Sequence, residues 1–316
     1  MDVPAITETG TYMNQHSWTR RDLLKLALAS GMAPTLSVAE GEDMISRTIP
    51  GSGESLPIIG LGTYNVFDLD STSANIEQSS AVVDLLTEKG GSLIDTSPMY
   101  NRSEKIVGDI IASRNNRDHL FLATKVWTDG ESAGQQQMAR SADLMNTDVI
   151  ELMQVHNLRD LDTHMASIRD WQQSGRIRYS GITHYTQSAL DELEQAMKSQ
   201  KPDFVQINYS LLERGADQRV LPLAIDLGIA VLINRPFVAG RLFGAVSNQS
   251  LPDWSASFAA SWGQFFLKFI ISHPAVSCVI PATSKLHHMT DNLGAGFGEL
   301  PDKATRNRMI DFFTAL

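Results

Sequence analysis

The sequence predicts an α/β protein folded as a single-domain (β/α)8 TIM barrel. Eight apolar segments of strand type follow one another along the chain, and each is followed by a segment with helical periodicity. Several strand segments, such as Leu120–Val126, are continuously apolar, which is typical of strands buried on both faces of a parallel sheet. Eight such units in about 270 residues fit a closed barrel better than an open sheet. Gly60-Leu61-Gly62 lacks the third glycine and the following helix of a dinucleotide fingerprint, which disfavours a Rossmann fold.

The units can be followed in order. Leu56–Tyr64 reads as a strand interrupted by glycines, and the helix Ser79–Lys89 after it ends at Gly90-Gly91. Each later strand is again followed by a helix, as a parallel sheet with right-handed crossovers requires. The other strands are Leu93–Asp95, Leu120–Val126, Val149–Val155, Ile177–Ile182, Phe204–Ile207, Ala230–Ile233 and Val276–Ile280, and the other helices are Glu104–Ser113, Ala133–Met145, Thr163–Ser174, Ser188–Ser199, Asp217–Leu227, Gly263–Ser272 and one from Leu286.

Two segments fall outside the repeat. Val238–Ser261 is a long Ser-, Ala- and Gly-rich connection after the seventh strand, of a length usual for a lid or binding loop. Leu300–Leu316 has the apolar spacing of one additional amphipathic helix.

Composition excludes several classes of function. The 316 residues are 42% hydrophobic and have a formal net charge of −10, which argues against a surface for nucleic acid or anionic membranes. No stretch reaches the roughly 18–20 apolar residues that span a bilayer, so we expect no stable membrane insertion. Cys278 is the only cysteine and lies in an apolar run, which indicates a buried structural thiol. The histidines, including the adjacent His287 and His288, form no metal-binding pattern.

The first 45 residues are interpreted as a targeting segment and linker, and residues 46–316 as the barrel domain. Arg20-Arg21, the weakly apolar stretch Leu26–Val38 and the small residues near Ala39 resemble a twin-arginine (Tat) export signal. This predicts a transient interaction with the Tat machinery and a periplasmic location. A basic surface helix or tail in a cytoplasmic protein is the alternative, and the acidic leader suggests that translation starts at Met13.

Polar residues fall where the second, third and fourth strands end. Asp95, Lys125 and His156 occupy these ends, and Tyr100 lies on the loop after the second strand. The carboxyl ends of barrel strands form the active-site face, so these four side chains are candidates for one site. Taken singly, each has an ordinary explanation: Asp95 as a turn former, Lys125 in a structural ion pair with Asp95, and His156 as a hydrogen-bonded core residue. Four together at one end of neighbouring strands favour function.

The motifs around these residues resemble those of the aldo-keto reductase family. They are Gly60-Leu-Gly-Thr-Tyr, Leu93-Ile-Asp-Thr-Ser-Pro-Met-Tyr-Asn-Arg-Ser-Glu, Thr124-Lys-Val and Gln154-Val-His-Asn. The resemblance runs from about Leu56 to Asn292 and implies a (β/α)8 barrel that reduces carbonyl groups. Tyr100 would then be the general acid, and Lys125, held by Asp95, would ease the release of its proton. His156 would orient the substrate oxygen.

The resemblance also implies a nicotinamide cofactor, with NADPH preferred and NADH as the alternative. Thr183 and His184 stand in place of the family's carboxamide-binding Ser-Asn, and Gln206 matches the family glutamine that contacts the same group. After the seventh strand the family's stacking aromatic is missing, and Asn234 or Arg235 is expected against the ring. The remaining predicted cofactor contacts are Thr63, Tyr64 and Phe237, and, in the adenine and phosphate segment, Thr283, Ser284, Lys285, His288, Asp291 and Asn292, where His288 replaces the usual arginine.

The leading hypothesis is a monomeric NADP-dependent reductase of a small aldehyde or ketone. An NADP(H)-binding sensor with little turnover is the second hypothesis, and a Schiff-base lyase using Lys125 is a third. Trp127 is expected either to form a pocket wall or to pack in its loop. Tyr209 is expected either at the barrel mouth or in the core.

Overall fold

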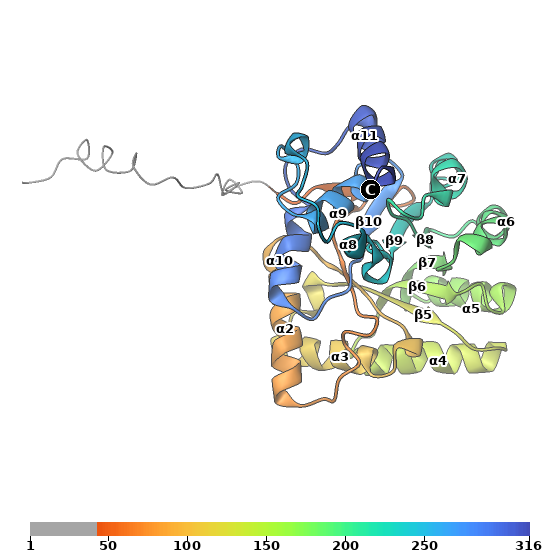
Figure 1. The fold of residues 1–316 in the computed structure, drawn as a ribbon. Coiled ribbons are helices and arrows are strands. Elements are labelled where there is room, and N and C mark those ends of the chain that lie inside the picture. The colour runs from red at the N-terminus through yellow and green to blue at the C-terminus, as the bar shows by residue number, and fades with distance from the viewer. Residues whose placement is uncertain (1–42) are drawn as a thin grey trace, which may run out of the picture. The chain divides into compact units, whose positions relative to one another are not determined.

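The predicted barrel is present in the computed structural model, which describes residues 43–316. One eight-stranded sheet has the order β3 to β10, every neighbouring pair is parallel, and the helices lie around its outside (Figure 1). The Tat-like motif and the position of Met13 lie outside the described residues. The barrel strands are β3 (Leu61–Gly62), β4 (Leu93–Asp95), β5 (Phe121–Val126), β6 (Ile150–His156), β7 (Ile177–Thr183), β8 (Phe204–Asn208), β9 (Ala230–Asn234) and β10 (Val276–Val279).

The barrel closes between its first and last strands through two glycines. Gly60 N–H donates to the Val279 carbonyl (2.9 Å), and Gly62 N–H donates to the Pro281 carbonyl (3.2 Å). A Cβ atom on Gly62 would lie 2.8 Å from the Ile280 carbonyl oxygen, so the backbones could not approach this closely with a side chain present. Gly60 and Gly62 therefore serve barrel closure and not a Rossmann fingerprint. We call their contact with residues 279–281 the closing seam.

A hairpin at the barrel floor was not predicted. Strands β1 (Ser46–Thr48) and β2 (Ser55–Pro57) pair antiparallel, so the predicted strand Leu56–Tyr64 is divided between this hairpin and β3. Ile49 and Leu56 of the hairpin are buried against residues that begin barrel strands, among them Leu93 and Phe121. The hairpin therefore covers the amino-terminal ends of the strands.

The helices follow the predicted order with shifted boundaries. They are α2 (Ser73–Glu88), α3 (Ser103–Arg114), α4 (Glu131–Leu144), α5 (Leu161–Gln173), α6 (Leu190–Gln200), α7 (Val220–Leu227), α8 (Arg241–Ala245), α9 (Trp262–Ile271), α10 (Leu286–Gly294) and α11 (Lys303–Thr314).

Local chemistry accounts for several of these boundaries. The Thr72 side chain accepts the Asn75 N–H (3.2 Å), so α2 begins earlier than its apolar stripe suggested. The helix predicted from Asp217 is broken at Arg219 into a 3-10 turn, Gly215–Gln218, and α7. The connection predicted at Val238–Ser261 contains the short helix α8, and the predicted additional helix is α11.

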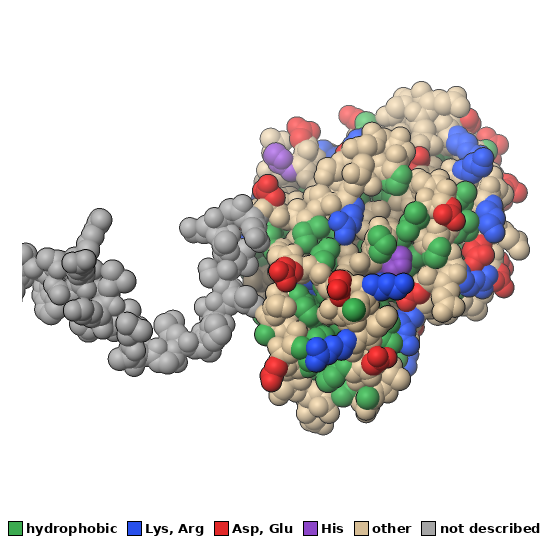
Figure 2. All heavy atoms as spheres, turned by 90° about the horizontal axis from the view of Figure 1, so that it is seen from above, with side chains coloured by type: hydrophobic (Ala, Val, Ile, Leu, Met, Phe, Trp, Pro, Cys, Tyr) green, Lys and Arg blue, Asp and Glu red, His purple; other side chains and the backbone are tan. Residues whose placement is uncertain are grey.

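One face of the molecule is of mixed polarity. Figure 2 views the molecule from above relative to Figure 1 and shows acidic, basic and apolar side chains interspersed on that face. Among the described residues, no helix has both the length and the apolar character needed to cross a bilayer.

Candidate active site

The four predicted catalytic side chains meet at the carboxyl ends of β4, β5 and β6. Asp95 ends β4, Lys125 is next to last in β5, and His156 ends β6. The Tyr100 ring lies edge-on to the His156 ring with centroids 6.2 Å apart, and the Lys125 ammonium is 4.9 Å from the Tyr100 ring centroid. Neighbouring parallel strands place their last residues side by side, which explains how residues distant in sequence form one site.

Asp95 and Lys125 form a buried ion pair. Lys125 Nζ donates to Asp95 Oδ2 (2.6 Å) and to the Thr96 carbonyl oxygen (2.7 Å), and the Lys125 side chain is only 1% exposed. Burial alone would lower the pKa of Lys125, but attraction to Asp95 and Tyr100 outweighs it and the pKa is raised. The lysine is therefore a cation at neutral pH, which disfavours the Schiff-base role because that chemistry needs a free amine.

Tyr100 closes a one-turn 3-10 helix, Pro98–Tyr100, directly after the Asp95–Ser97 segment. Its side chain packs edge-on against Tyr64, with ring centroids 5.0 Å apart. Burial raises the pKa of Tyr100, and the charge and hydrogen bonding of Lys125 act in the opposite direction. The predicted effect of Lys125 is thus present, but burial exceeds it, and Tyr100 stays protonated at neutral pH.

His156 is held as a neutral ring. Burial, together with the positive charges of Lys125 and His184, lowers its pKa to about 3. Its Nδ1 atom lies 3.2 Å from the buried Ser97 hydroxyl, within hydrogen-bonding distance. A neutral imidazole can donate one hydrogen bond to a carbonyl oxygen, as the predicted orienting role requires.

Two glutamines support Asp95 from the barrel interior. Gln154 Nε2 (3.1 Å) and Gln206 Nε2 (2.8 Å) both donate to Asp95 Oδ1. Gln154 was quoted in a motif but not predicted as a site residue. Its position two residues before His156 was the available signal, because alternate residues of a strand point to the same face.

Gln206 has no unused hydrogen-bonding position in this structure. Its Nε2 also donates to Gln154 Oε1 (3.0 Å), and its Oε1 accepts from Asn234 Nδ2 (3.1 Å) and the Thr183 hydroxyl (3.4 Å). To bind a carboxamide, Gln206 must exchange one of these contacts. Its predicted cofactor role therefore stays a prediction, while its contact with Asp95 is direct.

The other predicted nicotinamide-side residues surround the same mouth but differ in exposure. The buried Thr63 hydroxyl donates to the Asp95 carbonyl (3.0 Å), whereas Tyr64 is 53% exposed. His184 Nδ1 accepts the Tyr185 N–H (3.1 Å), and the two rings stack.

Asn234, the last residue of β9, and Arg235 and Phe237 after it contact different partners. Asn234 points to Gln206, and Arg235 is exposed with a left-handed backbone (φ 48°) and its guanidinium 5.7 Å from the Tyr185 ring centroid. Phe237 packs on Phe243, with ring centroids 5.0 Å apart. Asn234 and Arg235 thus lie on different sides of this loop.

The predicted adenine and phosphate segment lies at the amino-terminal end of α10. Thr283 is buried and its hydroxyl accepts the Lys285 N–H (3.1 Å), while Lys285 itself is exposed. Ser284 accepts a hydrogen bond from Gln78 through its carbonyl oxygen (3.4 Å). An exposed lysine at a helix N-terminus suits a phosphate.

Farther along α10 the predicted residues are mostly held by the protein. Asp291 accepts from the Ser261 hydroxyl (2.7 Å) and from Gln264 Nε2 (3.1 Å), and Asn292 is buried. Partial burial and the neighbouring side chains of His287 and Lys285 lower the pKa of His288, so this ring is a weaker cation than the arginine expected at its position.

The residues with open interpretations are now placed. Trp127 lies beside the site, with its ring centroid 6.4 Å from that of His156, and the Arg159 guanidinium lies 5.0 Å from its ring centroid. Tyr209 is fully buried, and its hydroxyl donates to Asp217 (2.6 Å), which supports the core interpretation. Cys278 is buried, and burial raises the pKa of its thiol well above the usual range.

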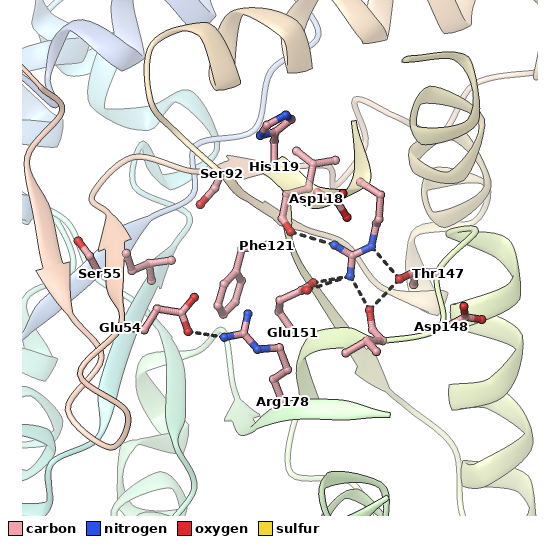
Figure 3. Close-up of a pocket in the computed structure, with 14 residues that line it drawn as sticks. Glu54, Ser55, Ser92, Asp118, His119, Phe121, Thr147, Asp148, Glu151 and Arg178 are labelled. Carbon is pink, nitrogen blue, oxygen red and sulfur yellow. Dashed lines mark hydrogen bonds and ion pairs between the residues drawn. The ribbon is translucent and has the colours of Figure 1, made fainter. Parts of the chain in front are cut away.

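A cavity of about 470 Å³ lies at the opposite end of the barrel (Figure 3). Four of its charged residues form two ion pairs, since Arg117 binds Glu151 (2.8 Å) and Arg178 binds Glu54 (2.5 Å). The Arg117 guanidinium also donates to the Thr147 hydroxyl (2.7 Å). The described residues, at this end and elsewhere, contain no cluster of potential metal ligands.

The chain is similar to known proteins in sequence and in fold. Residues 58–307 match the model of the Aldo/keto reductase family. The chain is similar to Aldo-keto reductase YhdN of Bacillus subtilis (27% identity over 217 residues, 64% of this chain and 65% of the relative). It is also similar to the NADH-specific methylglyoxal reductase of Escherichia coli (23% identity over 228 residues, 63% of this chain and 69% of the relative).

Solved structures have the same fold. The aldo-keto reductase from Klebsiella pneumoniae in complex with NADPH superimposes with a TM-score of 0.73 at 24% identity, covering 85% of this chain and 96% of the other. The holo form of aldo-keto reductase AKR11C1 from Bacillus halodurans gives a TM-score of 0.68 at 22% identity, covering the same shares.

Proposed function

The chain belongs to the aldo/keto reductase family, and we propose that it reduces an aldehyde or ketone to the alcohol with Tyr100 as the proton donor. The observation that supports this most is the joint placement of Tyr100, Lys125, Asp95 and His156 at the barrel mouth. In the proposed reaction all four side chains act, directly or through one another, on the same substrate oxygen.

A nicotinamide cofactor fits the residues around this mouth. The exposed cations Lys285 and Arg235 have no ion-pair partner within residues 43–316, and both follow the carboxyl ends of barrel strands. Asn234 also has a buried Oδ1 atom without a hydrogen-bond partner. We infer that Lys285 contacts a phosphate of NADPH and that Arg235 and Asn234 lie near the nicotinamide, with NADH as the alternative. When bound, the cofactor supplies the hydride.

The protein's own residues supply the proton and stabilise the charges that form during its transfer. As negative charge develops on the substrate oxygen, Tyr100 donates its hydroxyl proton to that oxygen, and the Lys125 cation stabilises the resulting tyrosinate. Asp95 keeps Lys125 charged in a site where burial opposes the charge. His156 donates a hydrogen bond to the same oxygen and fixes its direction.

The rim of the mouth favours an apolar substrate. Tyr64, Met99, Tyr185 and Leu212 follow the carboxyl ends of β3, β4, β7 and β8, and each is at least 40% exposed. Large apolar side chains left exposed around a polar centre are typical of a ligand site. We therefore propose an aromatic or aliphatic aldehyde or ketone as the substrate class.

The test of the proton donor is Tyr100→Phe, with Tyr179→Phe at the barrel floor as the matched control. We expect Tyr100→Phe to lower kcat for a benzaldehyde-type substrate by at least about 100-fold, the usual contribution of general acid catalysis. NADPH binding, measured by fluorescence titration, should be unchanged. Full activity of Tyr100→Phe would refute the assignment, and loss of activity in Tyr179→Phe would show that the effect is not specific.

A second function is supported by one observation: the stacking aromatic after β9 is replaced by Asn234, which is bonded to Gln206. A protein that binds NADP(H) without turning it over would tolerate this change. Retention of NADPH on gel filtration, with no turnover of a broad carbonyl panel, would favour such a sensor.

We also propose export by the twin-arginine route, on the basis of Arg20-Arg21 and the segment after them. This route transports folded proteins, so the barrel would leave the cytoplasm with its cofactor already bound. Cell fractionation and sequencing of the mature N-terminus test it, and an intact leader on cytosolic protein would contradict it.

A further inference from the structure

Ser97 is a buried residue of the catalytic loop to which no role has yet been given. It follows Asp95 and Thr96, its side chain is 0% exposed, and its hydroxyl has two partners. One is the Met99 N–H, which donates to Ser97 Oγ (3.2 Å). The other is His156 Nδ1, also at 3.2 Å.

These two contacts determine the direction of the hydrogen bonds. The Met99 amide can only donate, so it occupies one lone pair of Ser97 Oγ. The hydroxyl hydrogen of a fully buried serine needs an acceptor, and His156 Nδ1 is the only acceptor bonded to Ser97 Oγ within residues 43–316. Ser97 therefore donates to Nδ1, and in a neutral ring the hydrogen must then reside on Nε2.

We propose that Ser97 is a positioning residue that fixes His156 in the Nε2–H tautomer and ties the imidazole to the turn that holds Tyr100. The catalytic meaning of this proposal rests on the proposed reductase function, in which the Nε2–H group donates the hydrogen bond to the substrate oxygen. The tautomer itself does not depend on that function.

The link to Tyr100 is direct. Ser97 is the N-cap of the 3-10 turn Pro98–Tyr100, its side chain binding the Met99 N–H and its carbonyl accepting the Tyr100 N–H (2.9 Å). The same hydroxyl thus helps to shape the turn of the proton donor and to orient the histidine.

The other tautomer, with the hydrogen on Nδ1, is disfavoured because of the acceptors available to the Ser97 hydroxyl. If Nδ1–H donated to Ser97, the serine hydrogen would have no acceptor bonded to it in the described part of the chain. Nε2 would then present a lone pair toward the substrate oxygen and repel it. Both the buried hydroxyl and the chemistry favour Nε2–H.

The test is the tautomer of His156, read by long-range 1H–15N NMR on full-length protein labelled at histidine. The His156→Gln variant identifies the signal by its loss. We expect Nε2–H in the wild type from pH 6 to pH 9, and a mixture of tautomers in Ser97→Ala. Nδ1–H in the wild type, or an unchanged tautomer in Ser97→Ala, would overturn the proposal.

Kinetics supply the second readout. We expect Ser97→Ala to lower kcat about tenfold, with little change in the KM for the carbonyl substrate or in NADPH affinity. Ser97→Thr keeps the hydroxyl and should show the wild-type tautomer. Ser277→Ala is the matched control, since Ser277 is a buried serine whose hydroxyl accepts a strand N–H far from the site. An equal effect in Ser277→Ala would overturn a specific role for Ser97. If the wild type reduces no carbonyl, the proposed function fails, yet the NMR result still decides the tautomer.

Discussion

Replacing Asp95 by asparagine tests whether the buried ion pair stabilises the fold and keeps Lys125 charged. Asp95→Asn keeps the shape of the side chain but removes its charge. The carboxylate now accepts from Lys125 on Oδ2 and from two glutamine amides, Gln154 and Gln206, on Oδ1. An asparagine has one oxygen and one NH2 group, so whichever way it turns, either the ammonium or the two amides face a donor instead of an acceptor.

The expected loss can be worked from these contacts. Breaking a buried ion pair by removing one partner costs roughly 3–5 kcal/mol. The Thr96 carbonyl still binds Lys125, which favours the lower end of that range, about 3 kcal/mol. With a urea m-value of about 3 kcal/mol/M, the denaturation midpoint would fall by about 1 M.

The loss should also depend on pH. In the wild type the raised pKa of Lys125 contributes stability that is fully present below the unfolded value of about 10.4 and is lost as pH rises through the folded pKa. Without Asp95, burial dominates and the folded pKa falls below about 10.4, so the variant should gain stability as pH rises from 7 toward 10. The difference between the two proteins therefore narrows with pH.

Urea denaturation at pH 7 and pH 10, followed by circular dichroism, measures this difference. The control is Asp70→Asn, because Asp70 pairs with Arg102 at the surface with its side chain 78% exposed and should leave the midpoint unchanged. A loss below about 1 kcal/mol in Asp95→Asn, or a difference that does not change with pH, would refute this account of the pair.

Two further predictions concern lysines outside the catalytic group. Lys268→Met should lower the free energy of unfolding by about 2–4 kcal/mol in urea denaturation, because the buried ammonium donates to the carbonyls of Phe297 and Glu299 and both would lose that donor. Lys303→Met is the control, since Lys303 is exposed, and equal denaturation midpoints for the two variants would contradict the reasoning. Lys285→Glu should weaken NADPH binding about tenfold more than NADH binding in fluorescence titrations, a difference of about 1.4 kcal/mol, and an equal change for both cofactors would show that Lys285 does not contact the additional phosphate.

The sequence predicted the gathering of Asp95, Lys125 and His156 because one rule suffices for it. In a parallel barrel the carboxyl ends of all strands share one face, so strand order and strand ends determine which residues meet. The fold class followed from the same regularity, and it is confirmed.

The missed features depend on contacts that no periodicity encodes. Strands β1 and β2 of the floor hairpin are three residues each, too short for an alternation to be seen. Ser97 and Gln154 act through hydrogen bonds of buried side-chain atoms, and serine and glutamine are equally usual at positions without a functional role. The sequence around Tyr209 fits a position at the mouth as well as one in the core. Its burial and its contacts with Asp217 and with Arg306 of α11, which only the structure shows, place it in the core.

The closing seam has a consequence for how the protein is made. The segment around Gly60 is synthesised well before its hydrogen-bond partner Val279, which lies seven strands later in the barrel. Until then the strand pairing grows from one side, and the first and last members remain open edges able to pair with another chain. Ring closure is therefore a late, long-range step of folding, and a nascent or truncated chain that lacks residues 276–282 has an unprotected edge at β3.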